Sequence, residues 1–264
     1  MGALIEKKAR QREAVLAALR RKRKLNTHSA ATMLQVSDCT VRRLFEELEC
    51  NGDIIRVHGG AQLPPNKGLD YHFENLQQRQ SEQKQRIGEY ACRLIDNGDT
   101  IFLDSGTTIQ QMSYLLAEQL RRTPFHDIQI YTNSLRNLQI LADYCDVSLI
   151  GGLFRSRRQD FCGYFAEKVL EMLSFKKCFL SADGIGLAPD EGVMATDVNT
   201  AKLNHIILHR ADNVYLLADS TKFARRSFVQ YATLDDIDTI ITDKNLDEKY
   251  IQEFSKYDIE LQLV

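Results

Sequence analysis

The stretch TIFLDSGTT, residues 100–108, joins a short apolar run to a polar loop that contains a glycine. The run Thr100–Leu103 predicts a buried strand, and the pattern after Gly106 predicts the start of a helix. Gly106 allows a ligand to approach the backbone closely, and the neighbouring serine and threonines offer hydroxyl groups. Because a helix N-terminus presents unpaired N–H groups and a partial positive charge, this stretch predicts a phosphate-binding loop.

The rest of the chain repeats this alternation of strand and helix. Strand-like runs lie at 101–104, 128–132, 147–150, 177–181, 213–218 and 239–242. Helical patterns lie at 74–95, 109–120, 133–142, 165–173 and 200–209. Such alternation is typical of a parallel sheet covered by helices, so the fold class expected for this part is α/β with a mainly parallel sheet.

Polar residues or glycines follow five of these strands. Ligands of open α/β sheets bind at the carboxyl ends of the strands, so these residues are expected to converge on one crevice. The candidate ligand-binding residues at these strand ends are Asp104, Ser105, Gly106, Thr107, Thr108, Asn133, Gly152 and Asp183. The alternative is that they are ordinary strand-to-helix turns, in which Gly, Asn and Ser supply turn geometry and helix caps.

The first sixty residues carry a different charge from the remainder. They hold 12 Lys/Arg and 7 Asp/Glu, whereas residues 61–264 hold 22 and 29. A basic head on an acidic body favours contact between the head and a polyanion. Its apolar spacing indicates three helices, at about 5–19, 27–34 and 38–50, and its end, Asp53–Gly60, alternates like a strand. This pattern predicts a winged helix-turn-helix domain.

The third helix of such a domain lies in the major groove, led by its N-terminal residues. Arg42 and Arg43 are adjacent and point about 100° apart, so one is expected to read guanine while the other holds a phosphate. The DNA-binding candidates are Ser37, Thr40, Arg42, Arg43, Arg56 and His58. The alternative is a solvated basic helix in a protein–protein module.

Composition excludes several other classes of protein. The sequence contains no run of about 18 apolar residues, so a membrane span is not expected. The six cysteines form no CxxC pair and no zinc-like cluster with histidine, so neither a metal nor a cofactor is expected. Scattered cysteines of this kind are typical of reduced thiols in a cytoplasmic protein. The predicted domains are 1–60 for DNA binding, 61–73 as a linker with prolines and a glycine, and 74–264 for effector binding and oligomerisation.

Taken together, these motifs resemble those of the DeoR family of bacterial transcriptional repressors. The stretch VSDCTVRRLFEELECNGDIIRVHGGA, residues 36–61, is similar to the DNA-binding signature of that family. It departs at Leu44-Phe45, where the family usually has Asp-Leu. The remaining motifs follow in the order of the family's effector domain: GDTIFLDSGTT (98–108), YTNS (131–134), IGGLFR (150–155), SADGI (181–185), EGV (191–193) and LLADSTKF (216–223).

The resemblance implies an effector domain similar in fold to ribose-5-phosphate isomerase. It implies that residues 105–108 hold a phosphate and that Asp183, Glu191 and Lys222 face the hydroxyls and carbonyl of a sugar. The function expected from it is a transcriptional repressor of a carbohydrate operon, relieved by a phosphorylated sugar. The partners are then double-stranded operator DNA, the sugar phosphate and further copies of the chain, as a dimer or tetramer, because two-fold proteins read palindromes.

An enzyme is the alternative function. A sugar-phosphate isomerase fused to a DNA-binding module would need a general base and an electrophile at the carbonyl. Asp183 or Glu191, with Lys222, could in principle supply these groups. A DNA-binding module favours a sensor instead, because an enzyme has no need of one. A DNA-binding protein with a vestigial pocket is the third possibility.

Overall fold

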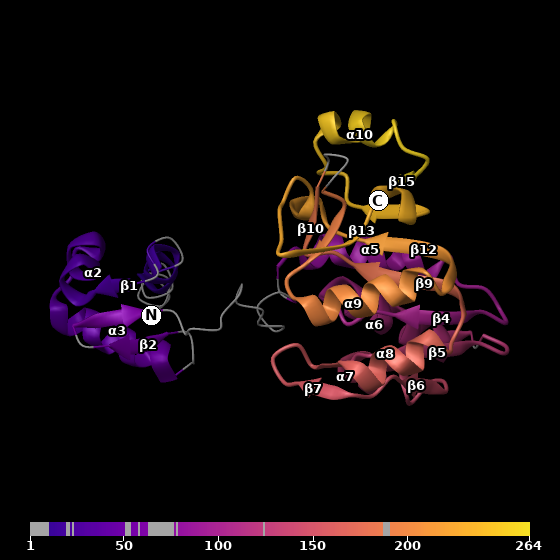
Figure 1. Ribbon diagram of the computed structural model, residues 1–264, viewed down its shortest axis with the longest axis horizontal. Helices are drawn as coiled ribbons and strands as arrows, with labels where there is room; N and C mark the ends of the chain where they lie inside the picture. The colour runs from indigo at the N-terminus through magenta and orange to yellow at the C-terminus, as the bar shows by residue number, and fades with distance from the viewer. Residues whose placement is uncertain are drawn as a thin grey trace. The chain divides into compact units, whose positions relative to one another are not determined.

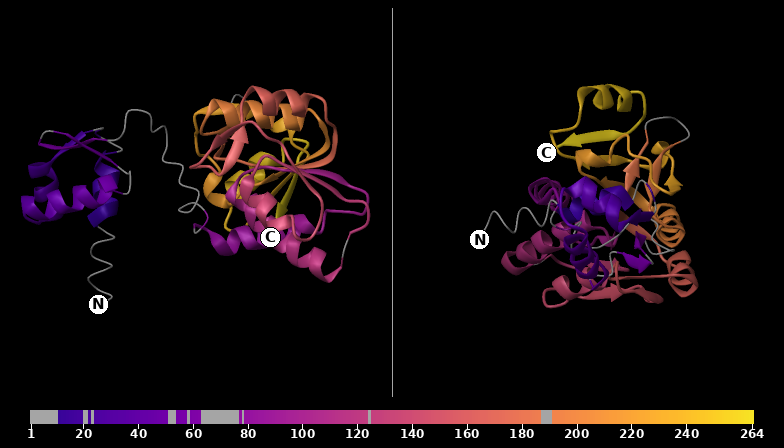
Figure 2. Two further views of the ribbon diagram at one scale, coloured as in Figure 1. Left: turned by 90° about the horizontal axis from the view of Figure 1, so that it is seen from below. Right: turned by 90° about the vertical axis from the view of Figure 1, so that its left-hand side faces the viewer.

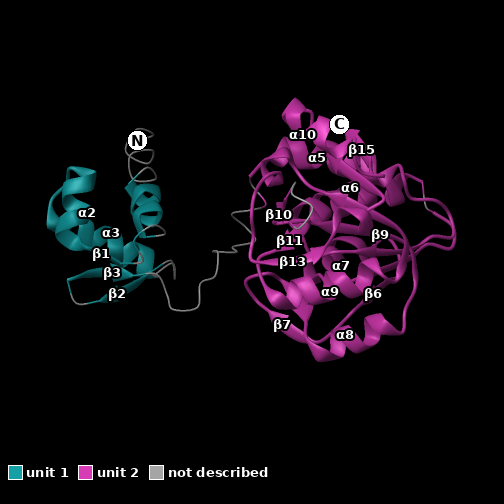
Figure 3. Ribbon diagram, turned by 45° about the horizontal axis from the view of Figure 1, so that its top comes forward, with its two compact units in different colours: residues 1–70 teal, residues 71–264 magenta. Residues whose placement is uncertain are grey.

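The structure is a computed structural model, and it describes residues 11–19, 22, 24–50, 54–57, 59–62, 77, 79–123, 125–186 and 191–264. The chain divides into two compact units, residues 1–70 and 71–264 (Figure 3). Each unit has hydrophobic core residues of its own. The predicted boundary after residue 60 falls inside a strand, β3 (Gly60–Gln62), and residues 63–73 of the predicted linker lie outside the described residues.

The N-terminal unit is built around two successive helices, α2 (Thr27–Leu34) and α3 (Asp38–Cys50). Asn26 caps α2 by accepting a hydrogen bond from the backbone N–H of Ser29 at 2.6 Å. The left-handed Gln35 (φ 54°) ends α2 and turns the chain into α3. This is the tight break of a helix-turn-helix, and a further helical stretch, 11–19, precedes it.

The inner face of α3 explains the departure from the family signature. Val41, Leu44, Phe45 and Leu48 are spaced as i, i+3, i+4 and i+7, and all four are buried. The dipeptide Leu44-Phe45 therefore belongs to the core of this unit.

The wing is a small antiparallel sheet. Its strands are β1 (Lys24–Asn26), β2 (Ile55–Val57) and β3, in the order β1-β3-β2. Gly60 is needed where β3 crosses β1, because a Cβ there would lie 2.4 Å from the carbonyl oxygen of Leu25. The sequence predicted the wing segment, whereas it did not predict β1, which begins inside the basic run of residues 20–24.

The C-terminal unit is organised by one seven-stranded sheet with the order β15-β14-β12-β9-β4-β5-β6 (Figure 1). Every pairing in it is parallel. Its strands are β4 (Thr100–Leu103), β5 (Gln129–Thr132), β6 (Val147–Leu149), β9 (Phe175–Ser181), β12 (Ala211–Leu217), β14 (Thr239–Thr242) and β15 (Glu260–Leu263). A winged helix-turn-helix followed by a mainly parallel α/β unit, as predicted, is confirmed.

Helices cover both faces of this sheet (Figures 1 and 2). Ile101 and Leu103 join the core beneath α5 (Ser81–Cys92), α6 (Thr107–Arg122) and α7 (Leu135–Leu141). Phe102 points to the opposite core, beneath α8 (Tyr164–Glu171), α9 (Val198–Leu208) and α10 (Glu248–Phe254). This alternation follows from the period of two in a strand. No helix among the described residues has the length and apolar content to cross a bilayer.

Several elements differ from the predicted ones. The helix expected over 74–95 is broken at Gln80, whose φ of 53° is left-handed, so α5 begins at Ser81. The sequence pattern missed α10 and β15. It also missed two small antiparallel sheets, formed by β7 (Leu153–Arg155) with β8 (Asp160–Cys162), and by β10 (Gly184–Ile185), β11 (Val193–Ala195) and β13 (Val229–Ala232).

The direction in which strands are added reverses between β4 and β9. From β4 the chain proceeds outward through β5 and β6, and it then returns to place β9 on the other side of β4. At such a point the connections leave in opposite directions and open a crevice at the carboxyl ends of the strands. This topology positions the site.

Candidate functional sites

A small pocket opens at the carboxyl ends of β4 and β9. We call it the strand-end pocket, and it is lined by Gly106, Thr107, Thr108, Arg158, Ser181, Ala182, Asp183, Ala195, Thr200 and Lys222. Half of these were predicted from sequence, namely Gly106, Thr107, Thr108, Asp183 and Lys222. The pocket therefore lies where the strand order reverses.

The N-terminus of α6 forms one wall of the strand-end pocket. Gly106 is its N-cap and supplies no side-chain hydrogen bond, and the first turn contains no acidic residue. The first N–H groups of a helix have no partner inside it, so they are available to an anion here. Thr107 is partly buried, Thr108 is buried, and each adds a hydroxyl to the lining.

Gly106 is required by close packing. A Cβ at this position would lie 2.1 Å from Ser181 Oγ and 2.5 Å from Ser181 Cβ. The loop that opens α6 therefore packs directly on the end of β9, and a side chain at position 106 would push the two strand ends apart.

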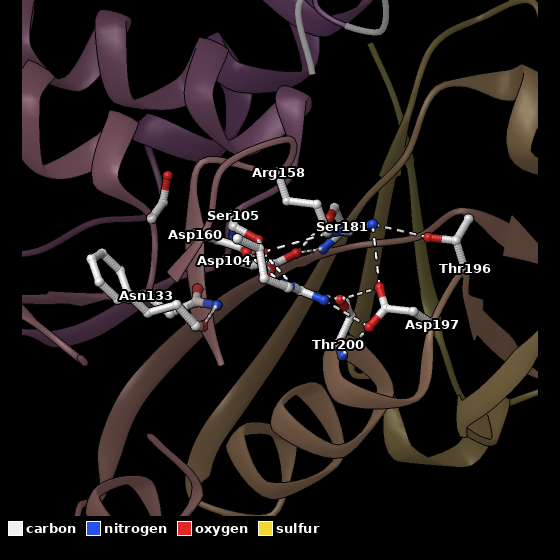
Figure 4. Close-up of polar contacts among 12 residues, drawn as sticks. Asp104, Ser105, Asn133, Arg158, Asp160, Ser181, Thr196, Asp197 and Thr200 are labelled. Carbon is white, nitrogen blue, oxygen red and sulfur yellow. Dashed lines mark hydrogen bonds and ion pairs between the residues drawn. The ribbon is translucent and has the colours of Figure 1, made fainter. Parts of the chain in front are cut away.

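Asp104 links the ends of the two central strands, β4 and β9, through Ser181 (Figure 4). Its Oδ2 accepts from both the backbone N–H, at 3.1 Å, and the hydroxyl of Ser181. Its Oδ1 accepts from the N–H of Ser105 at 2.6 Å. Burial raises the pKa of Asp104, against these hydrogen bonds, which lower it. Asp104 thus connects the ends of the strands that bear the pocket and is not part of the lining.

Ser105 is also occupied in the scaffold. Its hydroxyl donates to Asp160 Oδ2 at 2.9 Å, and its side chain is buried. Asp160, which has no exposed surface, in turn accepts from Arg155 at 2.7 and 2.6 Å. The predicted hydroxyl of the phosphate loop therefore points into a buried ion pair between the loop and the β7–β8 hairpin.

Two arginines of this hairpin, Arg155 and Arg158, connect it to the start of α9, and Figure 4 labels Arg158 beside Thr196 and Asp197. Arg155 donates to Asp197 Oδ1 at 2.7 Å and to Thr200 Oγ1 at 2.9 Å. Arg158 donates to Thr196 Oγ1 at 2.9 Å and lies 3.4 Å from Asp197 Oδ2. Burial pushes the pKa of Asp197 up, but the two arginines and the hydrogen bonds from Thr200 together hold that pKa below its usual range. This network keeps Arg158 at the pocket wall.

Lysines supply further positive charge. Lys222 lies in a short 3-10 turn, Ser220–Lys222, that Asp219 caps. Lys84, from the first turn of α5, is buried and donates to the carbonyl of Arg79 at 2.6 Å. Burial lowers the pKa of Lys84 to about 8, with Asp219 opposing this shift and Lys222 adding to it. The charges of Lys84 and Lys222 therefore interact across this corner of the unit.

The other predicted ligand residues occupy different places. The Oδ2 atom of Asp183 accepts from the N–H of Thr196 at 3.0 Å, although Asp183 still lines the pocket. Asn133 is buried and donates to the carbonyl of Phe161 at 3.1 Å. Gly152 packs against β8, since a Cβ there would lie 2.5 Å from the carbonyl of Cys162. Glu191 lies outside the lining and accepts from Arg226 at 2.7 Å.

Sequence reasoning missed three polar residues of the lining, Arg158, Ser181 and Thr200. Arg158 belongs to a run, RSRRQD, that resembles an exposed loop. Thr200 begins one of the predicted helices, and Ser181 begins the motif SADGI. Both could have been found by searching for hydroxyl residues near the strand ends at which the strand order reverses.

The DNA-binding candidates lie on the exposed side of α3 and on the wing. Ser37 caps α3 through a 3.3 Å hydrogen bond from the N–H of Thr40. Arg42 and Arg43 are both exposed. Arg56 donates to Glu46 at 2.8 Å, which fixes the wing on α3. His58 lies outside the described residues. The two arginines of α3 are thus exposed, whereas Arg56 is paired with Glu46.

A helix-turn-helix unit joined to an α/β unit with a strand-end pocket defines a ligand-responsive, DNA-binding regulator. The chain belongs to the DeoR family. Residues 11–67 match the DeoR-like helix-turn-helix domain, and residues 79–244 match the DeoR C terminal sensor domain.

Curated relatives cover most of the chain. It is 38% identical over 231 residues to a lactose phosphotransferase system repressor of Streptococcus mutans, covering 85% of this chain and 87% of that protein. It is 34% identical over 227 residues to the protein of the same name from Lactococcus lactis, covering 85% and 86%.

Solved structures show a weaker similarity. Ribose 5 phosphate isomerase A from Neisseria gonorrhoeae superposes with a TM-score of 0.40 and 16% identity, over 56% of this chain and 55% of that one. A similarity at this level transfers neither a ligand nor an activity.

Proposed function

We propose that this chain represses a carbohydrate-metabolism operon and releases its operator when a phosphorylated sugar occupies the strand-end pocket. The observation that carries the proposal is the uncapped N-terminus of α6, which faces the same pocket as Arg158 and Lys222. Backbone N–H groups, two cations and threonine hydroxyls are the donors that a phosphate prefers. The name of its relatives, lactose phosphotransferase system repressor, also supports a sugar-linked repressor.

The pocket also contains groups for the sugar part of the ligand. Asp183 lines it as an acceptor for hydroxyls, and Thr200 and Ser181 add hydroxyl groups. Glu191 would face the sugar only after leaving Arg226. We therefore assign the phosphate to the α6 side of the pocket and the hydroxyls to the Asp183 side.

A sugar-phosphate isomerase is less well supported. Isomerisation needs a base beside a carbon-bound proton. Of the two carboxylates proposed for that role, Glu191 is paired with Arg226 and lies outside the lining, so only Asp183 remains. A DNA-binding unit on the same chain also favours a sensor, which acts in the cytoplasm where its operator is.

Two or more copies of the chain are part of the proposal. One winged helix reads too few base pairs for a unique genomic site, and two-fold proteins read palindromic operators. The operator-bound form is then a dimer or a tetramer.

The test has two stages. A thermal-shift screen of the full chain against hexose and pentose phosphates should find a ligand that stabilises it, by about 2.7 kcal/mol at roughly 100 times its Kd. Fluorescence anisotropy should then show that this ligand releases operator DNA. A ligand that stabilises the chain without releasing operator DNA would show binding but no role in regulation. Turnover of the sugar phosphate would favour the isomerase.

A further inference from the structure

One face of α8 is apolar and exposed within the C-terminal unit. Phe165, Val169 and Met172 are 73%, 37% and 77% exposed. Their spacing of i, i+4 and i+7 places them in a single stripe along the helix. The neighbouring Ala166 and Leu170 are fully buried, so α8 packs on the unit with one face and presents a second apolar face outward.

The β7–β8 hairpin extends this stripe. Leu153 of this hairpin and Tyr164 at the start of α8 are 65% and 66% exposed. A Cβ on Gly163 would lie 3.8 Å from Leu153 Cβ, so β7 adjoins the start of α8, as Figure 1 also shows. We call the side chains of Leu153, Tyr164, Phe165, Val169 and Met172 the α8 patch. Single exposed apolar residues are ordinary, whereas a contiguous group of large ones marks an interaction surface.

The charges beside the α8 patch indicate which partner it fits. Lys168 and Glu171 flank the stripe on one side and are bonded to each other at 2.6 Å. If a second copy packs with its α8 antiparallel, the side of its α8 that carries Lys168 and Glu171 lies next to the same side of the first copy. Each Lys168 then meets the Glu171 of the other copy. In the same arrangement Phe165 lies close to Met172 of the second copy, because the midpoint of this pair is one residue, or about 1.5 Å, from that of Lys168 and Glu171. The patch is therefore complementary to itself.

We propose that the α8 patch is the surface on which two copies of this chain associate, with their α8 helices antiparallel about a two-fold axis. A two-fold interface uses the same patch on both copies, so self-complementarity is what it requires. The inference rests on the proposed function in one respect, namely that a palindromic operator needs two DNA-binding units.

The first experiment measures the oligomeric state of the full chain by sedimentation velocity. The double variant Phe165→Glu, Met172→Glu should raise the dissociation constant at least about 100-fold, because carboxylates would have to be buried against apolar side chains. Phe228→Glu is the matched control, because Phe228 is 70% exposed and lies outside the patch; it should leave association unchanged. Retained stabilisation by inorganic phosphate or by a sugar phosphate would show that each variant is folded.

The second experiment tests the orientation. Lys168→Glu and Glu171→Lys should each weaken self-association, and an equimolar mixture of the two should associate as well as the unaltered chain. Mixing the two variants cannot restore a Lys–Glu pair within one helix. Self-association that returns in the mixture therefore requires a Lys–Glu contact between copies. An unaltered chain that is monomeric with operator present would overturn both the surface and the proposed oligomer. Dimers that survive the double variant, or that only Phe228→Glu dissociates, would overturn the surface and leave the proposed repressor intact.

Discussion

Arg155 donates to both carboxylate oxygens of the fully buried Asp160, at 2.7 and 2.6 Å. Removing Arg155 would take from this buried carboxylate its two shortest charge-assisted hydrogen bonds and leave it only the Ser105 hydroxyl and Arg158, whose Nε lies 3.5 Å from Oδ2. We therefore expect Arg155→Met to lower the free energy of unfolding by about 3–5 kcal/mol. Urea denaturation of the full chain, followed by fluorescence and circular dichroism, measures this loss. Arg157, an exposed neighbour on the same hairpin, is the matched control, and Arg157→Met should change stability little. Equal effects of the two variants would contradict the assignment.

The effector response should depend on the wall of the strand-end pocket. Thr107→Ala and Lys222→Ala should each abolish release of the operator while leaving operator binding intact. A hydrogen bond to a charged phosphate is worth about 1.5–3 kcal/mol, so affinity for the sugar phosphate should fall roughly 10- to 150-fold. Anisotropy of labelled operator, titrated with the ligand found by thermal shift, is the measurement.

Thr123 gives the control for this prediction, because it lies at the exposed opposite end of α6. Thr123→Ala should release operator normally. If Thr107→Ala and Lys222→Ala also did so, the ligand would bind elsewhere. Loss of operator binding without ligand would instead assign the two residues to the stability of the fold.

Gly106→Ala should disturb the pocket by overpacking. Its Cβ would lie 2.1 Å from Ser181 Oγ, so either the α6 loop or the end of β9 must move. We expect a loss of about 1–3 kcal/mol in stability together with loss of phosphate binding. Gly151→Ala is the control, because no atom lies within 4 Å of a Cβ at that position. A stable Gly106→Ala protein that still binds its ligand would show that the loop has more room than the structure gives it.

The two exposed arginines of α3 should differ in what they read. Replacing the arginine that contacts guanine should cost about 1–3 kcal/mol and relax specificity at one base pair. Replacing the one that holds phosphate should weaken all sequences alike and reduce the salt dependence. Binding of Arg42→Ala and Arg43→Ala to a set of single-base operator variants separates them. Arg210→Ala, an exposed change in the other unit, should bind normally, and normal binding by both α3 variants would remove α3 from the groove.

Lys84 should give the stability a characteristic pH dependence. Its pKa is lowered to about 8 in the folded chain, chiefly by burial, from an ordinary value near 10.5. The unfolded chain therefore binds more protons between these values, and the free energy of unfolding contributed by Lys84 rises with pH across that window. Relative to Lys84→Met, the unaltered chain should therefore have a higher free energy of unfolding at pH 10 than at pH 7. A difference that is independent of pH would show that Lys84 is not desolvated.

Much of this architecture could be predicted because its patterns are local. The apolar run before Gly106 predicts one strand, and the spacing of Val41, Leu44 and Leu48 predicts one helix. The alternation of strands and helices along the chain then implies a parallel sheet. The helix expected over 74–95 was too long because a left-handed Gln80 gives no compositional signal of the kind that Gly or Pro gives.

The pocket was harder to predict because its residues are defined by tertiary contacts. Asp104 and Ser105 have the polar character of ligands, and only the packing shows that Ser181 and Asp160 already occupy them. Arg158 reaches the lining from a hairpin, held there by Asp197 and Thr196, which lie in a distant part of the sequence. No spacing rule connects such residues.

The pairing of β4 with β9 has a consequence for newly synthesised chains. Leu103 pairs with Phe179, so the floor of the pocket closes only after β5, β6 and the β7–β8 hairpin have all been made. Non-local parallel pairing of this kind is slow to form, and domains made first generally fold first. The N-terminal unit, which has its own core, therefore matures while its sensor is still incomplete. Until that pairing forms, the chain carries a folded DNA-binding unit but no completed pocket for a ligand.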